Sequence, residues 1–134
     1  MPVLARIEGI GEGYAEKLAQ AGIGSVRTLL SRGATRSGRQ RIAKVSGVNA
    51  AKVLAFVNRA DLFRVPGIGE EYSDLLEAGG VDSVPELAQR DAAHLCRALT
   101  KVNDRRQLVR RVPSQKEVER WIEQAARLPR VVTH

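Results

Sequence analysis

Cysteine, histidine and aromatic residues are scarce in this sequence of 134 residues, and their scarcity excludes several kinds of site. The lone Cys96 cannot form an internal disulfide, and the two histidines, His94 and His134, stand far apart in the sequence. No zinc-ligand spacing, catalytic triad, nucleotide-binding loop or pair of catalytic carboxylates can be recognised. We therefore predict that the protein is not an enzyme and needs no metal or other cofactor.

Long apolar runs are also missing. Arg6 and Glu8 interrupt the N-terminal apolar stretch before it reaches the length of a signal peptide, and nowhere do about 18 uncharged apolar residues follow one another. A single thiol is typical of proteins from a reducing compartment. These absences predict a soluble, cytoplasmic protein with no membrane partner.

The main feature that is present is a doubled motif. The segment Gly9-Ile10-Gly11 recurs at an offset of 58 residues as Gly67-Ile68-Gly69. An apolar residue between two glycines suits a tight turn, because glycine accepts positive φ and lets the backbone approach a neighbour closely. Acidic residues follow each pair of glycines and favour the N-terminus of a helix. Each turn should therefore lead directly into a helix.

The pattern beyond the first turn predicts three short helices. Residues 11–21 should form a helix that stops at Gly22, and Ser25 should cap a second helix that ends near Ser31. A loop over residues 33–38, with a cap at Ser37, should lead into a basic helix over residues 39–45. We expect Ile42 and Val45 to face inward in this third helix, which leaves Arg39, Arg41 and Lys44 for solvent or a ligand.

A longer helix is expected to close each copy. Asn49 should cap the first of these helices, in which four apolar residues at i, i+3, i+4 and i+7 form a core-facing stripe. The same stripe recurs at an offset of 65, so the second copy contains about seven extra residues, which we place near residues 103–113. The stripes are Val53, Phe56, Val57 and Ala60 in the first copy and Val118, Trp121, Ile122 and Ala125 in the second. We expect Tyr14 and Tyr72 to join them as core residues.

No segment alternates apolar and polar residues for long enough to predict a strand. The sequence therefore predicts an all-α fold with helices of ordinary length. The chain should form a single domain, 1–134, made of two repeats over about 1–62 and 63–134. Each repeat should end in its longer helix, and the two should share one core.

Two Gly-Ile-Gly turns, each followed by a helix and a Gly-apolar exit, resemble a tandem pair of helix-hairpin-helix motifs. The longer phrase from Asn58 to Leu76, together with residues 110–114 and 121–125, resembles the family called domain of unknown function 4332, for which no activity is named. The broader resemblance implies that amides of the hairpin contact DNA phosphates without reading bases, helped by a basic residue just after the second glycine. Here Glu12 and Glu70 occupy that position.

The net charge of +7 is unevenly distributed along the chain. Residues 17–60 carry nine basic side chains and no acidic one, whereas residues 61–104 carry nine acidic and four basic side chains. A long run of one sign attracts a partner of the opposite sign, and arginine suits bidentate contact with phosphate. The candidate nucleic-acid contacts are Gly9, Ile10 and Gly11 in the first turn, the basic residues Arg27, Arg32, Arg36, Arg39, Arg41 and Lys44, and Arg105, Arg106, Arg110 and Arg111 near the insertion.

Two hypotheses for function follow from this charge pattern. The leading one is non-catalytic binding of nucleic acid, with duplex DNA favoured, through its backbone and with little sequence preference. Replacing Arg39 and Arg41 with alanine should then flatten the dependence of affinity on salt by about 2 units, and replacing Arg110 and Arg111 should do less. The alternative is a protein-interaction module, in which the acidic second repeat docks a basic partner or the first repeat of another copy.

Overall fold

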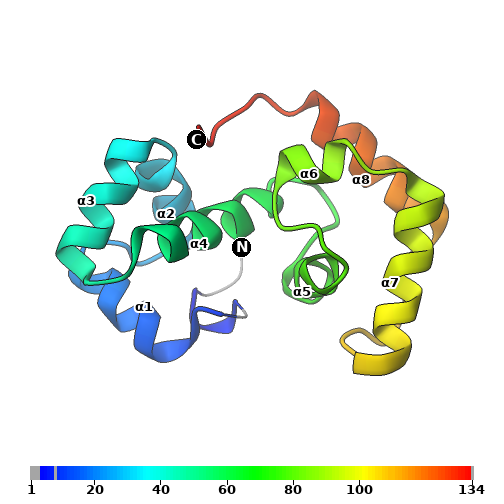
Figure 1. Ribbon diagram of the computed structural model, residues 1–134, viewed down its shortest axis with the longest axis horizontal. Helices are drawn as coiled ribbons and strands as arrows, with labels where there is room; N and C mark the ends of the chain where they lie inside the picture. Colours follow the sequence, from blue (N-terminus) through cyan, green and yellow to red (C-terminus); the bar gives the residue numbers. More distant parts are fainter. Residues whose placement is uncertain (1–3, 8, 134) are drawn as a thin grey trace. The chain divides into compact units, whose positions relative to one another are not determined.

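The computed structural model describes residues 4–7 and 9–133, apart from the side chain of Arg6. In this part of the chain the regular elements are helices, with no strand, so the predicted all-α fold is confirmed (Figure 1). None of the described helices is long and apolar enough to span a membrane. A short 3-10 turn, η1 (Leu4–Arg6), precedes α1 (Gly11–Gln20), α2 (Val26–Gly33), α3 (Arg36–Ser46), α4 (Ala50–Leu62), α5 (Glu70–Ala78), α6 (Val84–Ala88), α7 (Ala92–Arg106) and α8 (Gln115–Arg127).

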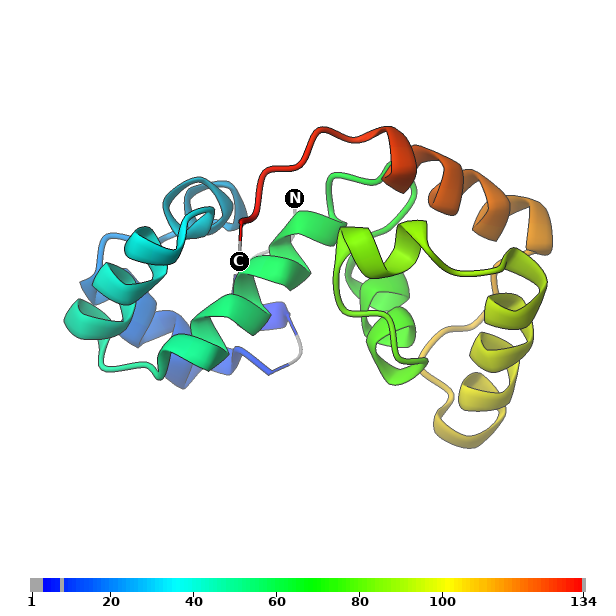
Figure 2. The same cartoon turned by 45° about the horizontal axis from the view of Figure 1, so that its top comes forward.

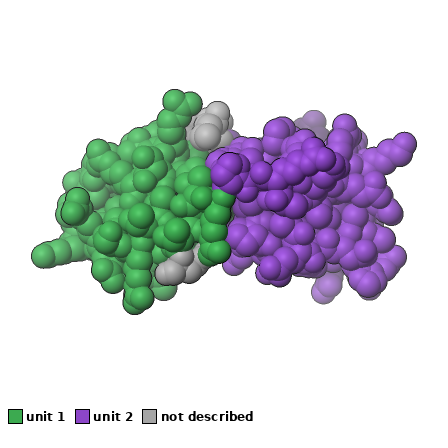
Figure 3. Space-filling model, turned by 90° about the horizontal axis from the view of Figure 1, so that it is seen from above, with its two compact units in different colours: residues 1–61, 130–134 green, residues 62–129 purple. Residues whose placement is uncertain are grey.

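The chain divides into two compact units (Figure 3). Unit 1 contains residues 1–61 and 130–134, and unit 2 contains residues 62–129. The boundary after Asp61 lies one residue from the predicted repeat boundary, but the last five residues join unit 1 and not the second copy. The predicted sharing of one core by the two repeats stays a prediction.

The two turns close with the same backbone hydrogen bonds. Ile10 N donates to Ile7 O at 3.0 Å, and Ile68 N donates to Val65 O at 3.1 Å. The glycine before each isoleucine has positive φ, with values of +92° and +93°, which a residue with a Cβ atom rarely adopts. The doubling seen in the sequence therefore extends to backbone geometry, and the assignment of these turns to helix-hairpin-helix motifs stays a prediction.

Local capping signals place most helix starts as expected. The Ser25 hydroxyl accepts a hydrogen bond from Thr28 N at 3.1 Å, and Asn49 Oδ1 accepts one from Ala51 N at 2.8 Å. Both predicted caps are confirmed. The predicted first-turn acids are also confirmed: they are Glu12 in α1 and Glu70 and Glu71 in α5.

The third helix differs from the prediction in its start and in the face that it buries. It begins at Arg36, and Thr35 is the cap in place of Ser37, because the Thr35 hydroxyl accepts from Gly38 N at 3.1 Å. The expectation that Val45 faces inward is wrong, since this side chain is 55% exposed.

The inward face of α3 carries Arg39, Ile42 and Ser46, which are all buried. Ser46 is accommodated because its hydroxyl donates to Ile42 O at 2.6 Å and accepts from Val48 N at 3.1 Å. A polar residue can replace an apolar one in a core when its hydrogen bonds are satisfied in this way.

The extra residues of the second copy lengthen the connection before its closing helix. Three residues, 47–49, join α3 to α4, whereas eight residues, 107–114, join α7 to α8 (Figure 2). The longer loop is ordered by Asn103, whose side-chain amide donates to Val109 O at 3.1 Å and whose Oδ1 accepts from Val109 N at 3.0 Å. The insertion is therefore a structured loop.

An aromatic pair recurs in the two units. The rings of Tyr14 and Phe56 lie 5.5 Å apart in an edge-to-face arrangement, and those of Tyr72 and Trp121 lie 5.2 Å apart. Phe56 and Trp121 are buried, which confirms their predicted core role, whereas both tyrosines are only half-buried. Each tyrosine therefore packs one side against its unit and keeps part of its surface exposed.

Candidate functional site

Unit 1 carries the entire net charge of the chain. It contains 11 basic and four acidic residues, whereas unit 2 contains 11 of each. Within unit 2, residues 62–104 have four more acidic than basic residues, and residues 105–129 have four more basic than acidic ones, so the two parts balance. An anionic partner is attracted by unit 1 far more than by unit 2.

Most basic residues of the run over 17–60 lie on the surface of unit 1. Two of the nine, Arg39 and Arg59, are buried. The other seven are exposed: Lys17, Arg27, Arg32, Arg36, Arg41, Lys44 and Lys52. None of these seven forms an ion pair with an acidic residue in the part of the chain that the structure describes. Their charge remains available to a ligand.

The structure brings Arg32 and Arg41 together at one surface pocket. The pocket has a volume of about 330 Å³ and is lined by Ala21, Arg32, Gly38, Arg41, Ile42 and Val45. Arg32 Nη1 donates to Ala21 O at 3.3 Å, which holds this guanidinium against the end of α1. The pocket thus combines two positive charges with the exposed side chain of Val45, a residue that hydrophobic periodicity had assigned to the core.

The remaining predicted basic contacts are more dispersed. Lys44 lies three residues after Arg41 on α3, and so on a neighbouring part of the helix surface. Arg36 lines a different pocket, next to Ala50 and Leu54 of α4. Arg27 and Arg32 differ by five positions on α2, about 140° around the helix. The six predicted basic residues therefore do not form a single row.

Arg39 is the clearest correction to the predicted site. Its side chain is only 4% exposed, and it donates to three carbonyls: Gly33 O at 2.9 Å, Ala34 O at 3.1 Å and Thr133 O at 2.6 Å. Burial, followed by the positive charge of Arg36, lowers the pKa of Arg39. This guanidinium holds the C-terminal segment against the α2–α3 connection, so its donors are already engaged within the chain.

The first turn offers fewer free backbone amides to a phosphate than the resemblance to helix-hairpin-helix motifs implies. Ile10 N is already bonded to Ile7 O, and the Ile10 side chain is buried. Gly9 is exposed and Gly11 is half-buried. Glu12 in the first turn of α1 would compete with an anion for the end of this helix.

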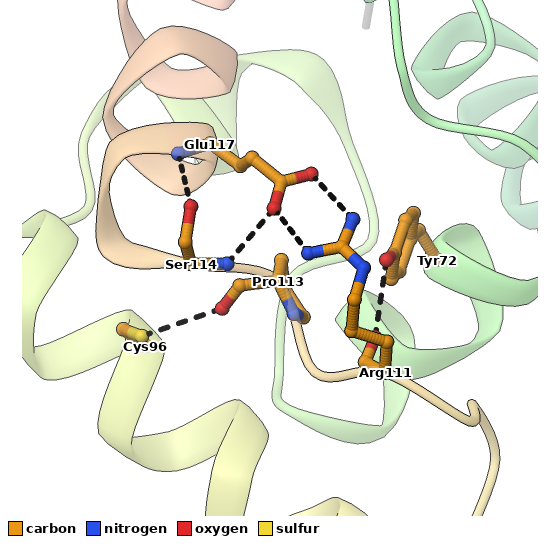
Figure 4. Close-up of polar contacts among 6 residues, drawn as sticks. All are labelled: Tyr72, Cys96, Arg111, Pro113, Ser114 and Glu117. Atoms are coloured by element: carbon orange, nitrogen blue, oxygen red, sulfur yellow. Dashed lines mark hydrogen bonds and ion pairs between the residues drawn. The ribbon is translucent and has the colours of Figure 1, made fainter.

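In unit 2, the predicted contact Arg111 is engaged within the chain (Figure 4). Its guanidinium forms a bidentate pair with Glu117, at 2.7 Å to Oε1 and 3.1 Å to Oε2, and its carbonyl accepts a hydrogen bond from the Tyr72 hydroxyl at 3.0 Å. Glu117 also caps α8, because it accepts from Ser114 N at 3.1 Å. The charge of Arg111 is thus neutralised locally.

The other three arginines near the insertion are exposed. Arg105 and Arg106 lie in the last turn of α7, where positive charge suits the end of the helix dipole. Arg110 lines a pocket together with Glu71 and Asp104. This mixed surface is a weaker attractor of phosphate than the surface formed by residues 17–60, which include no acidic residue.

The Arg111–Glu117 pair makes stability depend on pH in a defined window. The hydrogen bond from Arg111 and then the one from Ser114 N lower the pKa of Glu117 from 4.5 to about 2. Because the folded pKa lies below the unfolded one, the stabilisation is present above pH 4.5 and is lost as the pH falls toward 2. We expect Glu117→Gln, which lacks the charge, to show a smaller loss of stability in this window, measured as the urea midpoint at each pH. Identical profiles for both proteins would contradict this assignment.

Lys17, Lys52 and Tyr14 form a further basic cluster that was not among the predicted contacts. Both lysines lie over the Tyr14 ring, with Nζ at 5.6 Å for Lys17 and 5.2 Å for Lys52 from the ring centroid. Lys17 comes from α1 and Lys52 from α4, so the sequence holds no local signal that brings them together. The acid-free run that contains both lysines was the only available clue.

These observations define an all-helical protein of two compact units, with its net positive charge confined to the first. The chain belongs to the family described as Domain of unknown function (DUF4332), whose model matches residues 8–128. No curated protein and no solved structure matches the chain.

Proposed function

We propose that this protein binds nucleic acid, with duplex DNA as the favoured form, through backbone phosphates and without catalysis. The observation that carries this proposal is the set of seven exposed basic side chains on unit 1, which make no ion pair with a described acidic residue. Among these residues, Arg32 and Arg41 line one pocket, and Lys44 lies three residues after Arg41 on α3. Contacts of this kind position a protein on the duplex without reading its sequence.

The alternative of a protein-interaction module based on an acidic second repeat has less support. Unit 2 as a whole has no net charge, because its acidic and basic residues are equal in number. The balance removes the electrostatic reason for unit 2 to attract the basic unit of another copy.

The salt dependence of DNA binding tests the proposal. If unit 1 contacts about four phosphates, a plot of log affinity against log salt should have a slope of roughly −3.6, at about 0.9 per contact. Arg32→Ala/Arg41→Ala should flatten this slope by about 1.8, equally for unrelated duplex sequences. Fluorescence anisotropy of a labelled duplex at several salt concentrations measures the slope.

A matched control comes from two exposed arginines of unit 2. Arg97→Ala/Arg120→Ala removes the same charge and should leave the slope nearly unchanged. Absence of binding by the unmodified protein at about 50 mM salt, or equal slopes for the Arg32/Arg41 variant and the parent, would contradict the proposal.

A further inference from the structure

Comparison of the two units reveals a site that is filled in one and open in the other. In unit 2, the Tyr72 hydroxyl is bonded to the carbonyl of Arg111, and the guanidinium of Arg111 is paired with Glu117 (Figure 4). The loop that joins α7 to α8 therefore provides the hydrogen-bond acceptor for the tyrosine hydroxyl of unit 2.

The equivalent position in unit 1 lacks this cover. Tyr14 corresponds to Tyr72 at an offset of 58, but the connection between α3 and α4 is only three residues long and supplies no counterpart of Arg111. The Tyr14 hydroxyl has no hydrogen-bond partner among the residues that the structure describes. The Tyr14 hydroxyl therefore remains free to donate a hydrogen bond to a ligand, whereas the α7–α8 loop accepts the hydrogen bond of the Tyr72 hydroxyl in unit 2.

The charges around the two tyrosines differ. Lys52 occupies the position that Glu117 has in unit 2, at the offset of 65 that relates the closing helices. Lys17 corresponds to Leu75, which is fully buried, whereas Lys17 is exposed. The Nζ atoms of Lys17 and Lys52 both lie within 6 Å of the centroid of the Tyr14 ring, which attracts each of them. An anion beside this ring would be attracted by both positive charges.

The nearest acidic residues on α1 face elsewhere. Glu12 and Glu16 line another pocket, together with Ala5, Ala15 and Ala19. On a helix with about 100° per residue, they lie roughly opposite Tyr14. The cluster of Tyr14, Lys17 and Lys52 is therefore cationic on its open side.

We propose that Tyr14, Lys17 and Lys52 bind a phosphate group of the nucleic-acid backbone, with the hydroxyl donating one hydrogen bond and the two ammonium groups supplying the counter-charge. This inference rests on the proposed function and adds to it a second contact point, formed by α1 and α4. Unit 2 cannot bind phosphate at the equivalent place, because Arg111 and Glu117 already occupy it.

Two variants test separately what the lysine charges and the Tyr14 hydroxyl contribute to the affinity for DNA. Lys17→Ala/Lys52→Ala should flatten the salt slope for duplex DNA by about 0.9, because the contact with one phosphate is lost. Tyr14→Phe should lower the affinity about fivefold to tenfold with an unchanged slope, because it removes a hydrogen bond and no charge. Tyr72→Phe is the matched control, and it should leave the affinity for DNA unchanged.

The outcomes show whether the phosphate site alone fails or the proposed nucleic-acid binding fails as well. A slope that flattens in the Arg32/Arg41 variant but not in the Lys17/Lys52 variant overturns the phosphate site and leaves nucleic-acid binding intact. Equal losses of affinity in Tyr14→Phe and Tyr72→Phe would also overturn it, since the two tyrosines would then act only through folding. Absence of DNA binding by the unmodified protein overturns both.

Discussion

Replacing Arg39 with alanine is expected to lower the free energy of unfolding by about 3 kcal/mol, because one buried and two partly buried carbonyls lose their charged donor. The three acceptors come from two distant parts of the chain: Gly33 and Ala34 follow one another, and Thr133 lies 94 positions beyond Arg39. Thr133 N also donates to Ala34 O at 2.8 Å, and Val132 is buried. Arg39 thus fastens the C-terminal segment to the α2–α3 connection within unit 1.

Urea denaturation of three variants tests this role. Arg41 lies two positions after Arg39 but is exposed, so Arg41→Ala should change the free energy of unfolding by less than about 0.5 kcal/mol. A chain shortened to end at Pro129 removes the Thr133 acceptor, so its effect and that of Arg39→Ala should be less than additive. Full additivity, or an Arg39→Ala effect as small as that of Arg41→Ala, would show that the buried contacts contribute little.

Gly38→Ala is expected to destabilise the protein by about 3 kcal/mol or more, because a Cβ atom at this position would lie 2.0 Å from the backbone oxygen of Arg32. Backbone oxygen cannot rotate away as a side chain can. The start of α3 must therefore separate from the end of α2, which would disturb the neighbouring Arg39 contacts as well.

A glycine in α1 offers the matched control. A Cβ atom at Gly13 would meet nothing within 4 Å, and the residue has no positive φ. Gly13→Ala should stabilise the chain by about 0.5 to 1 kcal/mol, because alanine loses less backbone entropy in a helix. The midpoint of thermal or urea unfolding should rise in Gly13→Ala and fall in Gly38→Ala. A destabilised Gly13→Ala together with a neutral Gly38→Ala would contradict the packing described above.

The features that the sequence alone predicted are those decided by neighbouring residues. A cap such as Ser25 or Asn49 bonds an amide two or three residues away, and the φ of Gly67 depends on the turn that contains it. Repetition made these local signals stronger, because each turn and each closing helix occurs twice. The helical fold class and most of the helix starts could therefore be predicted.

The tertiary structure decided which face of α3 turns inward and which charges remain available. Hydrophobicity favoured Val45 for the core, but the carbonyls at the end of α2 and in the C-terminal segment offer Arg39 three acceptors, so a buried arginine took the inward face. Contacts between residues so far apart leave no periodic signal along the chain. The same limit applies to Lys17 and Lys52, which meet over Tyr14 only because α1 packs beside α4. Composition thus determined that the first half of the chain is basic, and packing determined which of its basic side chains are buried and which lie on the surface.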